Sequence, residues 1–508
     1  MLTRARIVPA VAVIAALLVP LSPATAKPPH CVGKAASDEW PTFGRDLRNS
    51  RTQDEPGDVG AGTAPTLAPV WSFSTGGAAT GTADFNGTPI VAAGCVFVNT
   101  AGGEILALDA ATGKQLWRVA VPLEPGTSAG LGGIFVSSPA VTNDLVVGLV
   151  NQTGSPYPVA LSRKDGEPAW RGEPMQSGEG YYTNATPVVY DGLLLAGYSP
   201  AEGDPTGRGG VAIYDVETGA LLTRVNVVPD EAFEKGYAGA GVWTAPAVDT
   251  KAGYAYVGTG NPYSKTIEHE NTNAIVKIDV DRTRGTFGTV VGSMKGNVEQ
   301  YDPAFRDGID PVCTALGDDP RLQLVVGNSA PCLQLDLDFG APPNLFTDGS
   351  GRTFIGDLQK SGVYHVADAD TMEREWSATV GVSCPACNAA ASAWDGDSLF
   401  VASSPVDAMW SLTEGGAPRW TSPIGDGTHY QSVTTAGGAV FTIDNLGNLL
   451  AWDAATGVPL LRRPMTADVP DPSMPPVALS SSGVAVASGT VYVAAGNAVV
   501  AYRPSSLV

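Results

Sequence analysis

A short motif that recurs along the chain is the feature that most constrains its fold. In the best copy, residues 107–117 read Ala-Leu-Asp-Ala-Ala-Thr-Gly-Lys-Gln-Leu-Trp. Asp and Gly suit a turn because the Asp side chain caps backbone N–H groups and Gly tolerates a positive φ. The motif therefore predicts a strand that ends at the Asp, turns through Thr-Gly and resumes toward the Trp. Complete or partial copies follow at residues 160–170, 213–219, 366–376, 416–420 and 451–457.

A single copy of this motif cannot build a core, so the copies must stack on one another. The Trp is large enough to wedge between neighbouring repeats and to bury its ring there. The chain has 508 residues, with 61 Gly, 40 Pro and 44% hydrophobic residues. This combination is typical of many short strands joined by tight turns, and it argues against disorder.

A second landmark, a Pro just before an apolar strand, divides the chain into units. It occurs at Pro89, Pro139, Pro187, Pro246 and Pro343. Counting onward from Pro89 gives eight units with room for about four strands each, which predicts an all-β fold, an eight-bladed β-propeller over 40-508. Residues 286-337 break the alternation and are predicted to be an insertion. The last unit, residues 484–502, is short of a strand that the segment around Trp40 could supply. A seven-bladed ring with an irregular end is the alternative.

The N-terminal residues 1-26 predict a secretory signal peptide. They hold Arg4 and Arg6, an apolar run over residues 7–21, and a small-residue cleavage pattern ending near Ala26. Residues 27-39 would then form a flexible leader. We expect an exported protein, secreted, extracellular or held in the cell envelope, without membrane insertion because the apolar run is too short. The net charge of −21 without a basic block argues against nucleic acid as a partner.

Six cysteines in an exported chain predict disulfides. Cys313 and Cys332 flank one loop and are the preferred pair, whereas Cys31 and Cys95 are a possible second pair. The pairing cannot be fixed from the sequence. Residues 384 and 387 are cysteines too closely spaced, in a chain with four His, to indicate a zinc site.

Five polar or aromatic residues occupy related places in neighbouring units. Glu202 and Asn261 each lie 15 residues after the Pro of their unit, just past its second strand. Trp243 and Asp338 lie 3 and 5 residues before the next Pro, at the entry to a first strand, and Lys360 lies 17 residues after Pro343. The start of the first strand and the end of the second lie on one face of an up-down blade. We therefore expect all five side chains to converge at one mouth of the central channel.

Such a group of side chains predicts a chemistry. Two carboxylates and an amide oxygen are hard ligands that match Ca²⁺. The aromatic plane beside them suits a flat, conjugated ligand, and one carboxylate could also accept a proton from an alcohol. The alternative interpretation is that propeller mouths are rich in loops, and loops carry Asp, Asn and Glu in any case.

These residues resemble a known family. The repeated motif is similar to the docking repeat of the pyrroloquinoline-quinone (PQQ) alcohol dehydrogenases, and the resemblance covers nearly the whole mature chain. Residues 241–262 are similar to the segment that supplies their Trp under the quinone and an Asn to Ca²⁺. Residues 199–210 resemble the segment with their Glu ligand, residues 336–343 that with their catalytic Asp, and residues 359–364 that with a Lys or Arg at the quinone carbonyls. The opening at 40–51 and the run at 338–343 look closest to polyvinyl-alcohol-dehydrogenase-like members.

The resemblance implies PQQ and Ca²⁺ as cofactors, with Glu202, Asn261 and Asp338 as metal ligands and Trp243 and Lys360 against the quinone. It further implies that Asp338 removes the proton of a small alcohol or polyol, that the Ca²⁺-bound quinone accepts the hydride, and that Lys360 stabilises the developing charge. Without a haem module, electrons need an external acceptor. The chain departs from the family in having no adjacent Cys pair and no clear match for an Arg from blade two. A non-catalytic PQQ-like propeller that serves as a binding or scaffold module is therefore the alternative.

Overall fold

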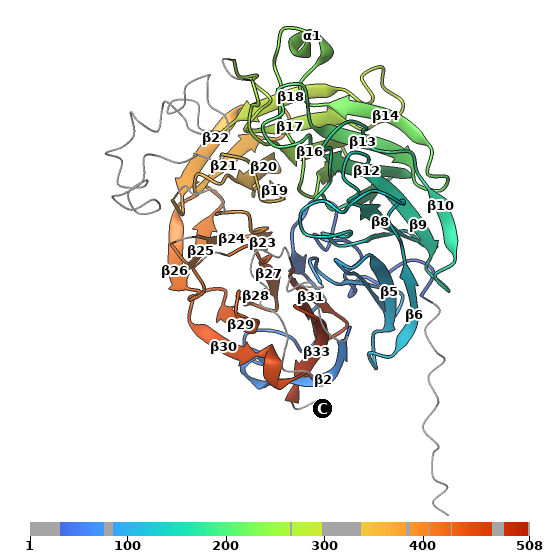
Figure 1. The fold of residues 1–508 in the computed structure, drawn as a ribbon. Helices are drawn as coiled ribbons and strands as arrows, with labels where there is room; N and C mark the ends of the chain where they lie inside the picture. The colour runs from blue at the N-terminus through green and yellow to red at the C-terminus, as the bar shows by residue number, and fades with distance from the viewer. Residues whose placement is uncertain are drawn as a thin grey trace, which may run out of the picture.

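The computed structural model of the protein describes residues 31–75, 85–264, 267–296, 337–382, 387–404, 406–427, 429–469 and 482–505. Its strands form eight sheets arranged in a ring, and the first strand of each sheet lies nearest the centre (Figure 1). The predicted all-β, eight-bladed propeller is confirmed, and the seven-bladed alternative is wrong. In the part of the chain just given, no helix has the length and apolar character needed to cross a membrane.

Four antiparallel strands make up each of the first four blades, numbered here in chain order. Blade 1 is β3 (Ile90–Ala92), β4 (Cys95–Asn99), β5 (Glu104–Asp109) and β6 (Gln115–Ala120). Blade 2 is β7 (Ala140–Val141), β8 (Leu145–Val150), β9 (Tyr157–Ser162) and β10 (Pro168–Arg171). Blade 3 is β11 (Val188–Tyr190), β12 (Leu193–Tyr198), β13 (Gly210–Asp215) and β14 (Leu221–Asn226). Blade 4 is β15 (Ala247–Asp249), β16 (Tyr254–Gly258), β17 (Ala274–Asp279) and β18 (Val290–Lys295).

The remaining blades complete the ring. Blade 5 is β19 (Asn344–Thr347), β20 (Thr353–Leu358), β21 (Val363–Asp368) and β22 (Arg374–Thr379). Blade 6 is β23 (Ala393–Trp394), β24 (Ser398–Ser403), β25 (Ala408–Thr413) and β26 (Pro418–Pro423). Blade 7 is β27 (Thr434–Ala436), β28 (Ala439–Ile443), β29 (Asn448–Asp453) and β30 (Pro459–Pro464), joined by β1 (Thr52–Gln53). Blade 8 is β31 (Val484–Ala487), β32 (Thr490–Ala495), β33 (Ala498–Pro504) and β2 (Leu67–Ser74), while α1 (Asp230–Phe233), η1 (Ala64–Thr66) and η2 (Met465–Ala467) are short helical turns.

The ring closes through β2, which comes from the start of the chain. It pairs antiparallel with β33 from Leu67 opposite Pro504 to Ser74 opposite Ala498. Figure 1 shows this junction as the blue strand beside the red one. The prediction that the segment around Trp40 supplies the missing strand is wrong. Residues 67–74 supply that strand instead, because they offer a longer run to the free edge of β33.

The Trp40 segment has a different place, along the inner edges of the first strands. Trp40 exchanges backbone hydrogen bonds with Val91 of blade 1. Arg51 is fully buried, and its guanidinium donates to the carbonyl oxygens of Phe43 and Val433, both at 2.6 Å. Backbone hydrogen bonds from blades 4 to 7 also end on this segment, from the amides of Val248, Leu345, Trp394 and Thr435. Residues 40–53 therefore satisfy strand edges that would otherwise face the channel.

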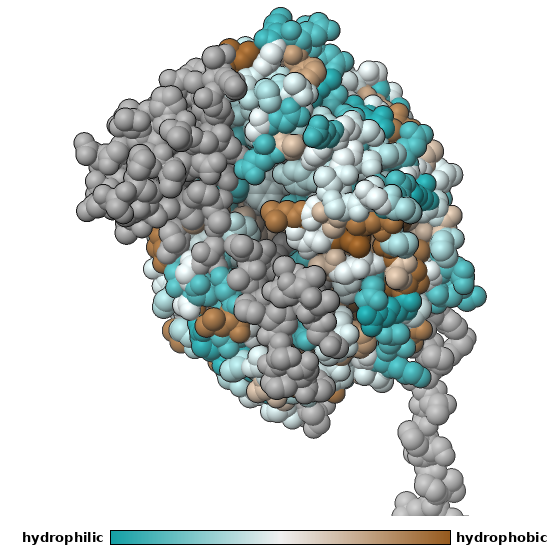
Figure 2. Space-filling model, in the orientation of Figure 1, coloured by the Kyte–Doolittle hydropathy of each residue, from teal (hydrophilic) through white to brown (hydrophobic). Residues whose placement is uncertain are grey.

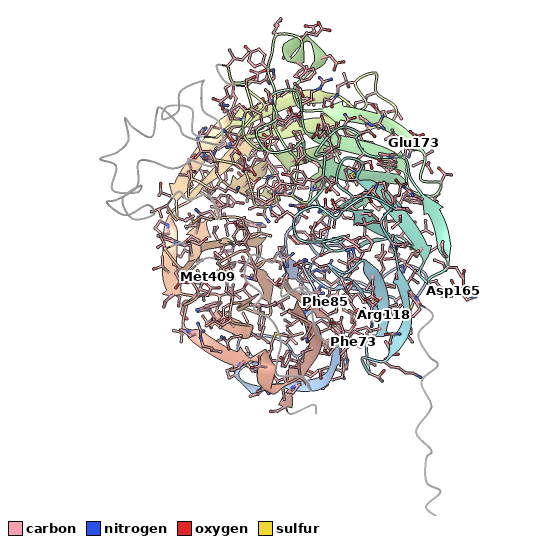
Figure 3. All side chains as sticks on the ribbon, in the orientation of Figure 1. Phe73, Phe85, Arg118, Asp165, Glu173 and Met409 are labelled. Carbon is pink, nitrogen blue, oxygen red and sulfur yellow. A yellow bond between two sulfur atoms is a disulfide. The ribbon has the colours of Figure 1, made fainter. Side chains whose placement is uncertain are left out.

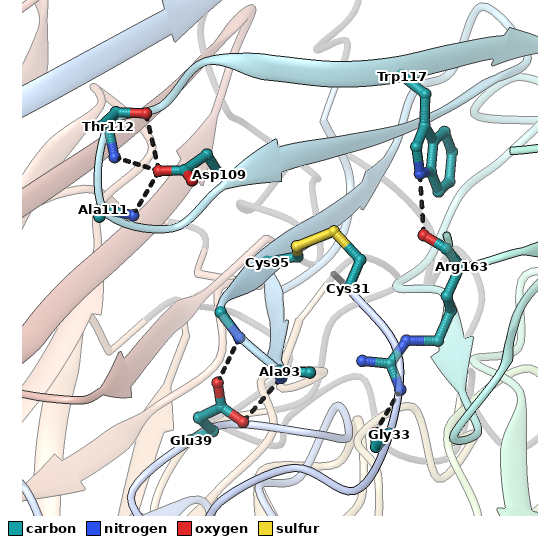
Figure 4. The surroundings of a disulfide bond; sticks show 11 residues. Cys31, Gly33, Glu39, Ala93, Cys95, Asp109, Ala111, Thr112, Trp117 and Arg163 are labelled. Carbon is teal, nitrogen blue, oxygen red and sulfur yellow. Dashed lines mark hydrogen bonds between the residues drawn. A yellow bond between two sulfur atoms is a disulfide. The ribbon is translucent and has the colours of Figure 1, made fainter. Parts of the chain in front are cut away.

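The repeated motif forms the turn that the sequence predicts (Figure 4). Oδ1 of Asp109 accepts hydrogen bonds from the amides of Ala111 and Thr112 and from the Thr112 hydroxyl. Nε1 of Trp117 donates to the Arg163 carbonyl of the next blade at 3.0 Å. A Cβ on Gly166 would stand 3.0 Å from the Trp117 ring, so each motif Gly provides both the positive φ and the space for the preceding blade's indole. The wedging role predicted for Trp is confirmed.

The residues just before the Trp40 segment are tied to blade 1 (Figure 4). Cys31 forms a disulfide with Cys95, the pair that the sequence left as a possibility. The buried carboxylate of Glu39 accepts hydrogen bonds from the amides of Ala93 and Gly94, both at 2.8 Å. Residues 31–39 are therefore held in place, contrary to the flexible leader predicted over 27-39. Residues 1–30, with the predicted signal peptide, lie outside the described residues, as do Cys313 and Cys332. Cys387 is also disulfide-bonded.

Blade 4 is complete without the predicted insertion. Strand β18 occupies Val290–Lys295 as its fourth strand, so the insertion cannot begin at about 286 as predicted. Residues 297–336 lie outside the described residues. Hydrophobic side chains mostly fill the seams between blades, and on the face drawn in Figure 2 they reach the surface only in separate patches among the described residues. In Figure 3, Phe85 lies near the centre of the ring, whereas Asp165 and Glu173 lie at its outer edge.

Candidate active site

The five predicted site residues all lie at one end of the ring, called here the site end. Trp243 precedes β15 and Asp338 precedes β19, both at the entry to a first strand. Glu202, Asn261 and Lys360 follow β12, β16 and β20, which are second strands. Because consecutive strands of a blade are antiparallel, the start of the first and the end of the second lie at the same end. Blades 3, 4 and 5 thus each contribute to one region.

Asp338 and Lys360 form the centre of this region. The Lys360 ammonium donates to Oδ2 of Asp338 at 3.2 Å, and the Lys360 backbone amide donates to the Asp338 carbonyl at 2.9 Å. A bridge between Phe339 and Gln359 continues this pairing. Side-chain exposures of 9% for Lys360 and 13% for Asp338 place the ion pair largely out of water, where charges interact more strongly.

The face of the Trp243 ring is the third part of this centre, beside Asp338 and Lys360. The Lys360 ammonium lies 5.0 Å from the Trp243 ring centroid, within the range of a cation–π contact. Gly340 lies between Asp338 and β19, and a Cβ on Gly340 would stand 2.7 Å from Cη2 of Trp243. Only Gly fits there without moving the indole, so residue 340 fixes how far the ring can lie from Asp338. The arrangement offers a flat aromatic surface with one ammonium and one carboxylate at its edge.

Asn261 is buried beside Asp338. Its exposure is 1%, and its Nδ2 has no hydrogen-bond partner among the described residues. Oδ1 of Asp338 lies 3.1 Å from where a Cβ on the preceding residue, Gly260, would stand. A buried amide that the protein itself leaves unsatisfied is uncommon, and it indicates a place where a further group binds.

Glu202 is the predicted residue that the structure holds least firmly. Its side chain is exposed, unlike those of Asn261 and Asp338. It nevertheless belongs to the same region, because the carboxylates of Asp338 and Glu202 both act on Tyr182. Burial raises the pKa of the Tyr182 phenol above its usual value, and these two carboxylates raise it further, while Lys360 lowers it.

Tyr182 is a site residue that the sequence reasoning missed. It is bridged to Ser199 by two backbone hydrogen bonds of 3.0 Å, which hold it at the end of β12. A signal for it was present: Tyr182 lies 5 residues before Pro187, the same offset that Asp338 has from Pro343. Asn388 is a second missed residue. Its Nδ2 donates to the Lys360 carbonyl at 3.0 Å, which fixes the Lys360 backbone from blade 6.

A third carboxyl, Asp357, lies behind the site. It is fully buried, and neither of its oxygens has a hydrogen-bond partner of ordinary geometry among the described residues. Oδ2 lies 2.7 Å from where a Cβ on Gly258 would stand, so Asp357 and Asp338 face alternate glycines of one blade 4 segment. Burial raises the pKa of Asp357 well above its usual value, opposed only by the Leu358 amide. Asp357 is therefore a neutral acid over the range in which ordinary carboxyl groups ionise.

The residues present fit a hard cation and a flat conjugated ligand. Two carboxylates and an amide are oxygen donors of the kind that Ca²⁺ prefers. The buried Nδ2 of Asn261 has no partner among the described residues, but it is a hydrogen-bond donor, so Asn261 would have to present its Oδ1 to the cation. Within the described ranges no group of three or more His, Cys, Asp and Glu side chains gathers as a metal site, so an amide ligand would be needed. Lys360 rests on the indole face that a planar ligand would cover, and its flexible side chain would have to turn aside.

Comparisons with known proteins agree with this geometry. A family model described as outer membrane protein assembly factor BamB, of PQQ-type repeats, matches residues 55–285. The chain is 24% identical to a polyvinylalcohol dehydrogenase of Pseudomonas sp. over 372 residues, which are 67% of this chain and 52% of that protein. It is also 24% identical to a polyvinylalcohol dehydrogenase of Sphingopyxis sp. (strain 113P3) over 482 residues, 86% of this chain and 68% of that protein. The chain thus spans only about half the length of the first of these relatives.

Among solved structures, the quinohemoprotein alcohol dehydrogenase of Comamonas testosteroni matches with a TM-score of 0.66 at 17% identity, covering 92% of this chain and 81% of that one. At this identity the likeness shows the fold. The fold and the repeats define a PQQ-type eight-bladed β-propeller. In its repeats and in its dehydrogenase relatives, the chain is similar to the PQQ-dependent alcohol dehydrogenases.

Proposed function

We propose that this chain is a PQQ-dependent dehydrogenase that is exported from the cell and oxidises an alcohol or a polyol. The observation that carries the proposal is the meeting of Asp338, Lys360 and Trp243 at distances of 3.2 and 5.0 Å, beside the unsatisfied amide of Asn261. A binding module has no physical need for a largely buried ion pair whose ammonium lies over an indole face. The named dehydrogenase relatives support the same proposal.

In this proposal the chain's own residues bind, orient and move a proton. Glu202, Asn261 and Asp338 would hold Ca²⁺, and Trp243 and Lys360 would hold the quinone, which supplies the hydride acceptor when bound. Asp338 accepts the proton of the substrate hydroxyl, since its carboxylate is hydrogen-bonded by the Lys360 ammonium that lies over the Trp243 ring. Lys360 also neutralises negative charge that develops at the ring edge. In this proposal an external acceptor would take the electrons from the reduced quinone.

The second candidate function is a non-catalytic propeller that serves as a binding or scaffold module. Two observations favour it: the exposed Glu202 side chain, and a family model described by an assembly factor. The two functions differ in whether the site binds quinone.

A titration of the purified mature protein with PQQ, with and without Ca²⁺, separates them. The dehydrogenase predicts saturable quenching of Trp fluorescence that requires Ca²⁺, together with dye-linked oxidation of an alcohol. A lack of saturable quenching at any accessible PQQ concentration would contradict the dehydrogenase and leave the scaffold.

A further inference from the structure

A groove lies beside the candidate active site, at the site end of blades 2, 3 and 4. Its volume is about 600 Å³, and it is open to solvent along one side. Three segments line it: residues 176–181 between blades 2 and 3, residues 201–208 within blade 3, and Phe233 at the end of α1. This volume falls within the range of small-molecule sites and exceeds what a simple alcohol fills.

The floor of the groove is fixed by Arg208. Its Nη1 donates to the Val228 carbonyl at 2.9 Å, and its Nη2 lies 2.5 Å from Oδ1 of Asp230. The guanidinium also stacks 4.5 Å from the Phe233 ring centroid. Tyr181 bonds the Arg208 backbone through its hydroxyl. Arg208 already binds a carboxylate, a carbonyl oxygen and an aromatic ring. Its guanidinium is therefore not available as the main partner of an anionic ligand.

The groove adjoins the site residues directly. Tyr181 and Ala201 line it, and their chain neighbours Tyr182 and Glu202 belong to the candidate site. The two segments are in close contact, since a Cβ on Gly180 would stand 2.4 Å from Cβ of Ala201. A ligand in the groove would therefore contact the chain neighbours of Tyr182 and Glu202, next to the bridge between Tyr182 and Ser199.

The charges and polar groups of the groove select a ligand class. Glu179 and Asp204 line it as carboxylates, and the only cation among its lining residues, Arg208, is paired with Asp230. Anionic ligands are disfavoured because like charges repel at this range. Gln176, Ser177 and Thr206 add amide and hydroxyl groups, and two aromatic rings supply apolar contact. Hydroxyl groups, which both donate and accept, match this mixture.

We propose that this groove binds neutral, polyhydroxylated molecules and extends the substrate beyond its reacting hydroxyl. The inference rests on the proposed dehydrogenase, and it narrows the substrate to neutral polyols, with hydroxy acids excluded. Ala201 and Tyr181 would direct one end of the ligand toward Asp338, while the carboxylates of Glu179 and Asp204 accept hydrogen bonds from hydroxyls further along it.

The test compares sorbitol with gluconate, which are similar in size and differ in charge. Saturation-transfer NMR on the full mature chain, without quinone, reports binding independently of turnover. We expect sorbitol to bind and gluconate to bind at least about tenfold more weakly, a difference of about 1.4 kcal/mol. Ser177→Trp should fill the groove and abolish sorbitol binding, and Asp204→Lys should reverse the preference. Glu373→Lys makes the same charge change on an exposed turn of blade 5 and should change neither.

Equal binding of gluconate and sorbitol, or unchanged sorbitol binding in both groove variants, would overturn the inference. Its failure is distinguishable from failure of the proposed function. Dye-linked oxidation of ethanol by a protein that does not bind sorbitol would keep the dehydrogenase and reject the groove. Selective sorbitol binding by a protein that never binds quinone would support the groove as a polyol site and reject the dehydrogenase.

Discussion

The Lys360 ammonium lies 3.2 Å from Oδ2 of Asp338, and both side chains are largely buried. Removing one charge without its partner should lower the free energy of unfolding, because the remaining charge would be unpaired and largely shielded from water. The pair therefore ties the position of the proposed base to that of the cation over Trp243. Substitutions that keep the shape of Asp338 are the ones that separate chemistry from folding.

Asp338→Asn should retain quinone binding and lose alcohol oxidation. The amide keeps an oxygen for Lys360 but cannot take a proton, so dye-linked activity should fall by about 10²–10⁴-fold, the range for a general base. Fluorescence titration with PQQ should remain saturable when the Ca²⁺ concentration is raised, because the variant also loses one charged Ca²⁺ ligand. Asp348→Asn, which changes a partly exposed carboxylate of the same blade, is the control and should keep full activity. Oxidation by Asp338→Asn at the parent rate would refute the assignment of the base.

Glu202→Gln should weaken the binding of Ca²⁺ and leave the fold unchanged. The exposed side chain makes little contribution to packing, whereas the number of charged ligands sets Ca²⁺ affinity, so at least about a tenfold rise in the Ca²⁺ requirement is expected. The measurement is PQQ-dependent quenching at a series of Ca²⁺ concentrations. Glu217→Gln, on an exposed turn of the same blade, should leave the Ca²⁺ curve in place. Identical curves for Glu202→Gln and the parent would remove Glu202 from the ligand set.

Gly340→Ala should displace the Trp243 ring. The new methyl group would stand 2.7 Å from Cη2 of Trp243 and 3.3 Å from Cβ of Ala389, so overpacking should cost about 1–3 kcal/mol of the free energy of unfolding. Near-ultraviolet circular dichroism and denaturant unfolding measure the two effects. Gly349→Ala is a matched control in the same blade, since nothing lies within 4 Å of its Cβ position. Equal stability and equal spectra for both variants would contradict the contact.

Asp357→Asn should stabilise the protein at neutral pH and have little effect in acid. Burial raises the pKa of Asp357 in the folded state, so between the unfolded and folded pKa values only the folded chain holds the proton. Stability is therefore lost as the pH rises through this window, at about 1.4 kcal/mol for each unit of pKa difference. The neutral amide has no such loss.

Unfolding free energies at pH 4 and pH 8 check the sign of this effect. Asp348→Asn serves as the opposite case, because hydrogen bonds from Ser350 lower the pKa of Asp348. Its stabilising contribution is present above the unfolded pKa and is lost as the pH falls through the folded value, so the variant should lose stability at pH 8. A variant of Asp357 that is less stable than the parent at pH 8 would show that the buried carboxyl is ionised and paired.

Arg51→Met should strongly destabilise the ring. It removes hydrogen bonds to the carbonyl oxygens of Phe43 and Val433 and to the Thr434 hydroxyl. The Phe43 carbonyl keeps the Trp40 indole as a donor, whereas the buried Val433 carbonyl loses the Arg51 hydrogen bond, and a buried group left unsatisfied costs about 1–3 kcal/mol. Arg48→Met removes a side chain bonded to Thr347 near the surface of the same segment and should cost much less. Chemical denaturation of both variants gives the comparison, and equal losses would mean that the inner segment is not fixed through Arg51.

The repeat positions could be predicted from the sequence because each one is determined locally. Asp109, Gly166 and Trp117 have roles set by turn geometry and by the neighbouring blade, so a recurring motif reports them. The shared end of the ring for Asp338, Trp243 and Lys360 followed from counting residues from a common landmark. These relationships repeat along the chain, and repetition makes them visible in a single sequence.

The remaining features depend on single contacts between distant segments. Trp71 docks against Gly113 like the other indoles, but no Asp turn precedes it, so the strand Leu67–Ser74 was not recognised as the partner of β33. The exposure of Glu202 is set by how its loop folds, which spacing does not determine. Asp357 follows apolar residues in β20, and its burial depends on the close approach of Gly258 from blade 4, which the sequence of β20 alone does not reveal.

The pairing of β2 with β33 has a consequence for how the protein is made. A strand synthesised early must wait for its partner until residues 498–504 have emerged, so a nascent chain carries an unmatched edge throughout its production. Fragments that stop short of β33 should therefore aggregate through this edge. The ring can close only when translation is complete.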